Sequence, residues 1–248
     1  CESPGAMSAR RLAVLRLGEV RYAEAQALQR RLSDGVAEGR IAPDLLLLLE
    51  HEPTVTLGRG ARPASLPIAP EELEQRGLTV VEVDRGGDVT WHGPGQLVGY
   101  PIMNLKRHRE DLHWYLRRVE EALILALGRL GIPAERNSGQ TGAWTKGRKI
   151  ASIGIHVRQW VTTHGFALNV TNQLDQFALI VPCGIPGVEM TSVERELGDG
   201  TTGRRDDGRV QWVTVLDSIV ESFGEVFELV PYEAELQQIL PDYAFRTS

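Results

Sequence analysis

A cysteine close to two prolines is the strongest candidate for chemistry in this sequence. Cys183 lies in the segment Val-Pro-Cys-Gly-Ile-Pro of residues 181–186, and its prolines exclude a regular helix or a central strand there. The adjacent glycine permits a tight turn and the close approach of a ligand. A thiol on such a turn is suited to nucleophilic attack, because it is accessible and has backbone N–H groups nearby to stabilise an oxyanion. The alternative is a buried loop cysteine, the commonest role of a free cysteine.

A lysine at the end of a predicted hairpin turn is the second candidate. Residues 142–155 contain a basic, glycine-containing turn, and Lys149 stands where this turn enters an apolar strand. Only three of the 27 basic residues are lysines, and lysine, unlike arginine, can exchange its proton in an active site. An ammonium beside a thiol favours the thiolate, so Lys149 would activate Cys183 if the two met. Otherwise it is an ordinary solvated hairpin lysine.

Two glycine-rich segments, residues 85–96 and 164–169, also carry histidine, threonine and aromatic residues. This mixture predicts a surface that faces a ligand. Neither a phosphate loop nor a dinucleotide fingerprint is present. Residues 58–62 (Gly-Arg-Gly-Ala-Arg) could cradle a phosphate, although a surface turn is the simpler interpretation. The six histidines lack the spacing of metal ligands, and His92 and His164 are possible bases for the cysteine.

Composition limits the class of protein. A chain of 248 residues, 42% apolar and 24% charged, can bury a substantial core in one large domain or two small ones. Two cysteines exclude a disulfide framework and a cysteine-rich zinc site, and predict a reduced, cytoplasmic protein. The net charge of −6 argues against general nucleic-acid binding. No apolar run approaches the roughly 18 residues that a membrane span needs.

The elements that must position these residues alternate irregularly. Apolar periodicity predicts helices over residues 20–38, 70–76, 111–130, 192–197 and 214–229, with another after Pro231. A capping box of Thr191 and Glu194 would begin the helix at 192. Strands are predicted over residues 11–17, 44–50, 54–57, 78–83, 96–103, 142–145, 149–157 and 164–170, with loops over 85–95 and 198–208. Many of the strands are short enough for hairpins, which predicts an α+β fold with a mixed sheet.

Residues 1–6, which precede Met7, are expected to be a cloning remnant or an upstream extension. Neither a repeat nor a linker divides the remaining chain. We therefore predict that residues 7–248 form a single catalytic domain, with a possible small C-terminal lobe after about Leu197.

Four motifs follow one another between about residues 12 and 197. They are Arg85-Gly86-Gly87-x-x-Thr90-x-His92-Gly93-Pro94-Gly95-Gln96 with Tyr100-Pro101, Gly142-Ala143-Trp144 with Lys149-Ile150-Ala151-Ser152-Ile153-Gly154, His164-Gly165-Phe166-Ala167-Leu168-Asn169, and Pro182-Cys183-Gly184-Ile185. In this order they resemble the lipoyl(octanoyl) transferases, which belong to the biotin- and lipoate-protein ligase superfamily. Ala143 stands where valine is usual in that family.

The resemblance implies a biotin/lipoate ligase-like catalytic domain, an α+β fold with a mixed, largely antiparallel sheet packed by helices. It implies an acyltransferase for the first step of lipoate biosynthesis. An octanoyl group would pass from octanoyl-acyl carrier protein to a lysine of lipoyl domains of 2-oxo acid dehydrogenases or of the glycine-cleavage H protein. No cofactor, metal, nucleic acid or membrane is implied, and no ATP is needed because the donor is already a thioester.

Carried over by motif, Cys183 is the acyl-accepting nucleophile and Lys149 the residue that favours its thiolate. His164 then has a structural or binding role. We also expect an apolar tunnel for the eight-carbon chain beside the glycine-rich loops. The implied lining of the acyl and pantetheine site consists of Arg85, Gly86, Gly87, Asp88, Val89, Thr90, Trp91, His92, Ser152, Ile153, Gly154, Gly165, Phe166 and Ala167.

Three alternatives stay open at this point. One is an ATP-dependent lipoate or biotin ligase, which would not need the Cys183 thiol. Another is a cysteine hydrolase of acyl thioesters that uses His164 or His92, and the third is a catalytically silent module that binds acyl carrier protein. Acyl carrier proteins are acidic, so docking needs a local basic face, for which the candidates are Arg117, Arg118, Lys146 and Arg148.

Overall fold

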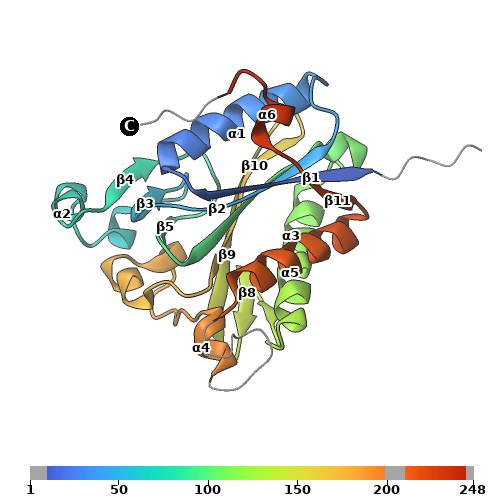
Figure 1. The fold of residues 1–248 in the computed structure, drawn as a ribbon. Helices are drawn as coiled ribbons and strands as arrows, with labels where there is room; N and C mark the ends of the chain where they lie inside the picture. The colour runs from blue at the N-terminus through green and yellow to red at the C-terminus, as the bar shows by residue number, and fades with distance from the viewer. Residues whose placement is uncertain (1–9, 199–209, 244–248) are drawn as a thin grey trace, which may run out of the picture.

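The main sheet has eight strands in the computed structural model, which describes residues 10–198 and 210–243 (Figure 1). In pairing order they are β11 (Val230–Glu233), β1 (Arg11–Glu19), β2 (Asp44–Glu50), β6 (Gln96–Ile102), β10 (Val161–Asn169), β9 (Arg148–Arg158), β8 (Gln140–Thr145) and β7 (Glu135–Asn137). Strands β11 and β2 run parallel to β1, and the other neighbours are antiparallel. The predicted α+β class with a mixed, largely antiparallel sheet is confirmed.

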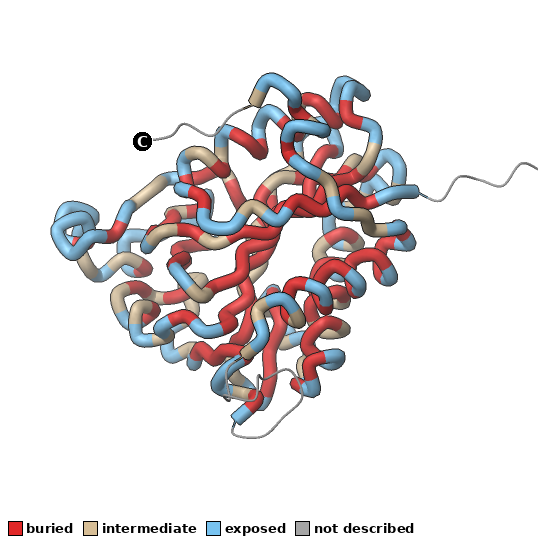
Figure 2. The backbone as a smooth tube through the Cα atoms, in the orientation of Figure 1, coloured by how far each residue is buried: buried red, intermediate tan, exposed pale blue. Residues whose placement is uncertain are grey.

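The leucine run of β2 divides its side chains between two cores. Leu46 and Leu48 face one core, and Leu45, Leu47 and Leu49 face the other, because successive residues of a strand point to opposite faces. A strand buried on both faces reads as continuous apolar sequence rather than as an alternation. Figure 2 shows the central strands buried and the outer surfaces of the helices exposed.

Helices cover both faces of this sheet (Figure 1). Helix α1 (Tyr22–Ala37) packs on one face, whereas α3 (Leu112–Arg129) and α5 (Trp212–Phe227) pack together on the other. On that second face the ring of Phe223 stacks between those of Phe166 and Phe227. No helix among the described residues combines the length and the apolar composition that crossing a membrane requires.

A small second sheet lies beside the main one and carries the glycine-rich loop. Its strands pair in the order β4 (Thr79–Glu82), β3 (Thr54–Leu57) and β5 (Val89–His92), with α2 (Pro70–Gln75) packed nearby. The prediction of a continuous loop over residues 85–95 was wrong, because β5 is fully buried and pairs antiparallel with β3. Flanking glycines conceal this strand in the sequence, and its partner is more than thirty residues away.

The C-terminal part differs from the prediction in two details. Ser192, not Thr191, caps α4 (Val193–Leu197), accepting a hydrogen bond from the Arg195 N–H at 3.2 Å. Pro231 lies in β11, at the edge of the sheet where its missing N–H is tolerated, and the final helix, α6, covers only Leu236–Ile239.

The segment considered as a possible small lobe supplies α5 to the core and β11 to the main sheet. The leader of residues 1–6 and the predicted loop from residue 199 onward lie outside the described residues.

The ring of Phe166 on β10 lies directly over Gly99, its partner on β6. This close contact leads to a prediction about stability. A Cβ atom on Gly99 would overlap the ring of Phe166, whereas one on Gly128 of α3 would meet open space. We expect Gly99→Ala to lower the free energy of unfolding by about 1–3 kcal/mol through overpacking. Gly128→Ala, the control, should be neutral or stabilising by up to about 1 kcal/mol. Urea denaturation measures both, and equal destabilisation of the two variants would contradict the packing argument.

Candidate active site

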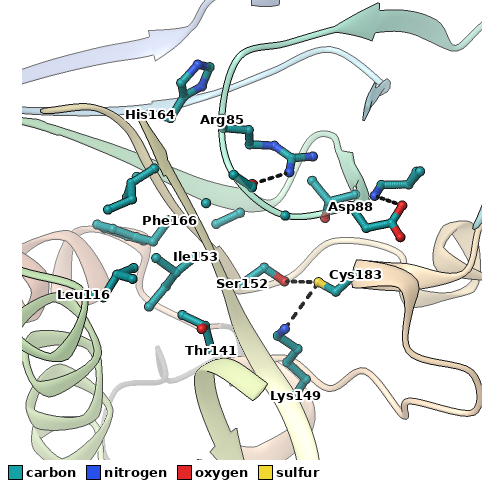
Figure 3. A pocket seen from close by; sticks show the side chains of 18 of the residues that line it. Arg85, Asp88, Leu116, Thr141, Lys149, Ser152, Ile153, His164, Phe166 and Cys183 are labelled. Carbon is teal, nitrogen blue, oxygen red and sulfur yellow. Dashed lines mark hydrogen bonds between the residues drawn. The ribbon is translucent and has the colours of Figure 1, made fainter. Parts of the chain in front are cut away.

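A cavity of about 530 Å³ lies between the glycine-rich loop, strands β9 and β10, the start of α3 and the turn that carries Cys183. Figure 3 shows side chains from these elements directed toward one another, although they come from distant parts of the sequence. All four family-like motifs therefore contribute to one place in the fold.

Cys183 occupies a strained turn at the edge of this cavity. It lies in the 3₁₀ turn η4 (Pro182–Gly184), with φ +55° and ψ +18°. A non-glycine residue in the left-handed region costs about 1–3 kcal/mol and persists only where its surroundings enforce it. Here the Val181 N–H donates to the Ser65 carbonyl at 2.9 Å, and the Arg62 guanidinium donates to the Gly184 carbonyl at 3.2 Å. The turn holds the half-buried thiol toward the cavity.

Lys149 lies directly against this thiol. Its Nζ is 3.3 Å from Sγ of Cys183, and the residue is only 2% exposed, so the alternative of a solvated hairpin lysine is wrong. Its backbone N–H donates to the Glu189 carbonyl and its carbonyl accepts from the Thr191 N–H, both at 2.9 Å. The chain just beyond the cysteine turn thus pins the lysine strand.

A β-bulge turns two side chains of β9 toward the same sulfur. Ala143 pairs with Ala151 and Trp144 with Lys149, so Ile150 is an extra residue on β9. In a regular strand, residues three apart face opposite sides, but the bulge places Lys149 and Ser152 on one side. The Ser152 hydroxyl lies 3.9 Å from Sγ (Figure 3). The strand is predicted from the sequence, but its bulge is not.

Arg85 brings a buried positive charge to the cavity. It is 7% exposed, and it donates to the Thr56 carbonyl at 2.9 Å, the Thr56 hydroxyl at 2.8 Å and the Gly86 carbonyl at 3.0 Å. Burial lowers the pKa of its guanidinium, but an arginine this basic remains charged near neutral pH. Because its hydrogen-bond acceptors are neutral oxygens, its charge is available to anions in the cavity.

Residues 58–60 support the glycine-rich loop rather than a phosphate. The N–H groups of Gly58, Arg59 and Gly60 donate to the carbonyls of residues 88, 85 and 87, so they are not available for a ligand, and the suggested phosphate cradle was wrong. Asp88 adds a second anchor, accepting from the Ser65 hydroxyl at 2.8 Å and from Arg62 Nε at 3.3 Å.

Nearly all the predicted lining residues do line the cavity. Trp91 is the exception: its ring packs in a separate apolar cluster, with its centroid 5.6 Å from that of Phe177. Successive side chains of β5 point to opposite faces of the sheet. The Trp91 side chain therefore points away from the face that carries Thr90 and His92. The predicted residues found in the lining are Arg85, Gly86, Gly87, Asp88, Val89, Thr90, His92, Ser152, Ile153, Gly154, Gly165, Phe166 and Ala167.

Tyr22, Tyr100, Leu112 and Leu116 were not predicted as lining residues, and together with the predicted ones they give the cavity two different sides. Leu112 and Leu116 of α3 join Ile153 and Phe166 to form an apolar side. Hydroxyl and imidazole groups of Tyr22, Tyr100, His92 and His164 line the opposite, polar side. The expected apolar tunnel is therefore only part of the cavity, because polar side chains also line it. Helical periodicity identifies the stripe of α3 but not the fact that its first turn faces a cavity.

Neither candidate histidine is bonded to the thiol. His92 Nδ1 donates to the Gln96 side-chain oxygen at 2.8 Å, and His164 Nε2 lies 2.7 Å from an Asp84 carboxylate oxygen. Among the described residues, the side-chain hydrogen bonds of Cys183 go to Lys149 and Ser152. A cysteine–histidine pair is not formed.

The basic residues considered for docking all have carboxylate partners. Arg117 pairs with Glu120 and Arg118 with Glu121, while Lys146 and Arg148 share Glu196. These ion pairs reduce the net positive charge that helix α3 or the turn between β8 and β9 could offer to an acidic partner.

Comparison with known proteins gives consistent matches. Residues 21–216 match the model of the lipoyl protein ligase A/B catalytic domain. An octanoyltransferase of Koribacter versatilis is 47% identical over 234 residues, covering 92% of this chain and 89% of the relative. An octanoyltransferase of Geobacter sulfurreducens is 52% identical over 189 residues, covering 76% and 77%.

Among solved structures, a lipoate-protein ligase A bound with ATP superposes with a TM-score of 0.70 at 16% identity, covering 92% of this chain and 90% of the other. This likeness confirms the predicted biotin/lipoate ligase-like fold.

Buried histidines beside the cavity generate a pH prediction. Burial lowers the pKa of His51 from 6.5 to about 4, and it also lowers the pKa values of His92 and His164. Between about pH 6.5 and pH 4 the unfolded chain therefore binds more protons than the folded one, so stability falls as pH falls. For His51 the loss is roughly 3 kcal/mol.

Urea denaturation across this pH range tests the prediction. His51→Gln, which cannot titrate, should show a flatter dependence than the unsubstituted protein, whereas the exposed control His113→Gln should show the same dependence. An unchanged slope in His51→Gln would refute the assignment.

Proposed function

The chain belongs to the lipoyl protein ligase A/B catalytic-domain family, and on this basis we propose that it is an octanoyltransferase of lipoate biosynthesis that works through a thioester on Cys183. The observation that carries the proposal is the 3.3 Å contact between the Lys149 amine and the Cys183 thiol at the edge of a cavity. The relatives named octanoyltransferase support the transferred group.

The first step exchanges one thioester for another. The Cys183 thiolate attacks the carbonyl carbon of the octanoyl thioester; the bond from carbon to Sγ forms and the bond to the donor sulfur breaks. The departing donor thiolate takes a proton from the Lys149 ammonium. Little free energy separates reactant and product thioesters, so the step needs no ATP.

The second step forms the amide. A free lysine has a pKa near 10.4, so fewer than about one in a thousand acceptor amines are neutral at pH 7. Lys149, left neutral by the first step, takes one proton from the acceptor ammonium. The acceptor nitrogen then attacks the thioester, the carbon–nitrogen bond forms, Cys183 leaves as thiolate, and the second proton goes to solvent. Lys149 and Cys183 are thereby restored.

The two sides of the cavity suit the two parts of the donor. The alkyl chain would lie along Leu116, Ile153 and Phe166, where burial contributes about 0.8 kcal/mol per CH₂ group. The buried charge of Arg85 on the glycine-rich loop favours the thiolate and the negative charge that develops on the carbonyl oxygen.

The donor is octanoyl-acyl carrier protein in this proposal, and the acceptors are lipoyl domains of 2-oxo acid dehydrogenases and the glycine-cleavage H protein. We also propose one catalytic domain from Met7 onward, because α5 and β11, which follow Leu197, belong to the main core and sheet. A cytoplasmic location stays a prediction from cysteine usage.

Intact-mass spectrometry tests the thioester. After mixing with octanoyl-acyl carrier protein, the protein should gain the mass of one octanoyl group on Cys183 and lose it when a lipoyl domain is added. Cys183→Ala should abolish both the adduct and transfer while remaining folded, and Cys183→Ser should retain little activity. Release of free octanoate without an acylated lipoyl domain would instead indicate a hydrolase, and ATP-dependent release of pyrophosphate would indicate a ligase.

Replacement of the lysine tests its role in proton transfer. Lys149→Arg keeps the positive charge but cannot exchange a proton readily, so we expect the transfer rate to fall about 100-fold or more. Lys106→Arg, on the 3₁₀ turn η2 (Leu105–Arg107), is the matched control and should keep the normal rate. Near-normal turnover by Lys149→Arg would exclude Lys149 as the base.

A further inference from the structure

Strand β8 forms one wall around the Lys149 side chain. Trp144 is the cross-strand partner of Lys149, and the Lys149 Nζ lies 5.3 Å from the centroid of the indole ring. This distance is within the range of a cation–π interaction, in which the negative face of an aromatic ring attracts a cation. The tryptophan is 3% exposed, so little water competes for the ammonium there.

Both ends of the Gly142-Ala143-Trp144 motif are adapted to the lysine. A Cβ atom on Gly142 would lie 2.9 Å from Lys149 Cε and would overlap the Ala151 carbonyl, and the glycine has φ +138°, which other residues rarely adopt. The Trp144 indole N–H donates to the Gln140 carbonyl at 3.2 Å, which fixes the ring in place. Glycine leaves room for the lysine stem, and tryptophan offers a π face to its charge.

We propose that Trp144 is a positioning residue that stabilises the ammonium form of Lys149 and holds it against Cys183, with Gly142 providing the space. The inference rests on the proposed function for its catalytic meaning, but the contact itself can be tested without any substrate. It gives the Gly142–Trp144 motif a role in the proton chemistry of the dyad.

The contribution of Trp144 is largest when Cys183 carries the acyl group. In the resting dyad a thiolate would balance the ammonium, but a thioester has no charge. Lys149 must then become an ammonium again as it takes the proton of the acceptor, in a buried position where an unpaired charge is costly. The π face of Trp144 remains beside Nζ at this stage and attracts the ammonium as it forms.

Charged groups on the surrounding elements have other partners. Arg85 on the glycine-rich loop is bonded to Thr56. The carboxylates near the lysine strand are paired as follows: Glu120 with Arg117 and Arg136, Glu196 with Lys146 and Arg148, Glu189 with Arg148 and Arg195, and Asp88 with Arg62. Within the described chain, Cys183 and Trp144 are the groups in direct contact with the Lys149 amine, while the uncompensated charge of Arg85 acts on the same thiol.

Lysine-selective NMR provides the test, because the chain has only three lysines. With ¹³Cε-labelled lysine, each side chain gives a separate signal whose shift follows its ionisation, and Lys149→Arg assigns the signal of Lys149. In Trp144→Leu we expect the Lys149 signal to lose its ring-current shift and to titrate about half a pH unit or more lower. Trp144→Phe, which keeps a weaker π face, should lie between, and Lys106 and Lys146 should not move.

Rate measurements on the two steps provide the functional readout. The alkaline limb of acylation, where Lys149 acts as an acid, and the rising limb of transfer, where it acts as a base, should move together to lower pH in Trp144→Leu. The acidic limb of acylation, set by the thiol, should stay in place. The transfer step should also slow about 10-fold, with an unchanged KM for the donor.

If Trp144→Leu does not fold, Trp144 can be replaced by a fluorinated tryptophan. Fluorination weakens the π face of the indole but keeps the shape of the ring. The same replacement at Trp114, which packs against Phe227, is the control. An unmoved Lys149 titration in the fluorinated protein would overturn the inference. Absence of a Cys183 thioester in the unsubstituted protein would instead refute the proposed function, and the NMR result would stand apart from it.

Discussion

The contact between a buried primary amine and a thiol is the interaction on which this site depends. Lys149 is almost completely removed from water, and such a position is costly for an ammonium unless opposite charge or a polarisable surface replaces the lost hydration. Sγ of Cys183 at 3.3 Å and the Trp144 ring at 5.3 Å provide that replacement. Removing either neighbour would leave the ammonium poorly compensated.

The fold brings these groups together by local distortion as much as by regular structure. Cys183 is held in a left-handed turn, and a bulge at Ile150 redirects one end of β9. Both distortions are disfavoured in isolation, and contacts from elsewhere maintain them. The hydrogen bonds from residues 62–65 and 181–185 fix the turn, while the segment 189–191, which forms an isolated β-bridge with Lys149, fixes the lysine. Strain at functional positions is therefore supported by the rigid sheets on either side.

The chemistry of the cavity follows from its two unlike sides. Burial raises the pKa of Tyr22 to about 12 and that of Tyr100 also rises, while burial lowers the pKa values of His92 and His164. These polar groups are therefore neutral near pH 7, and Arg85 supplies positive charge. An acyl thioester has a neutral alkyl chain and a carbonyl oxygen that becomes negative during attack. The apolar side of the cavity complements the chain. The polar side, where Arg85 supplies positive charge, complements the carbonyl oxygen.

Local sequence determined a large part of this arrangement. Prolines and glycine around Cys183 were enough to predict a tight turn, the leucine run of β2 a buried strand, and the stripe of α3 a helix, because each depends on neighbouring residues and backbone preferences. The motif resemblance added the pairing of Cys183 with Lys149, which are far apart in the chain. Only the tertiary structure decided that β5 pairs with β3, that Trp91 points away from the cavity, and that a bulge turns Lys149 and Ser152 to one side. Strand register and bulges arise from pairing between distant segments, and that information is not present in the spacing of residues along a single strand.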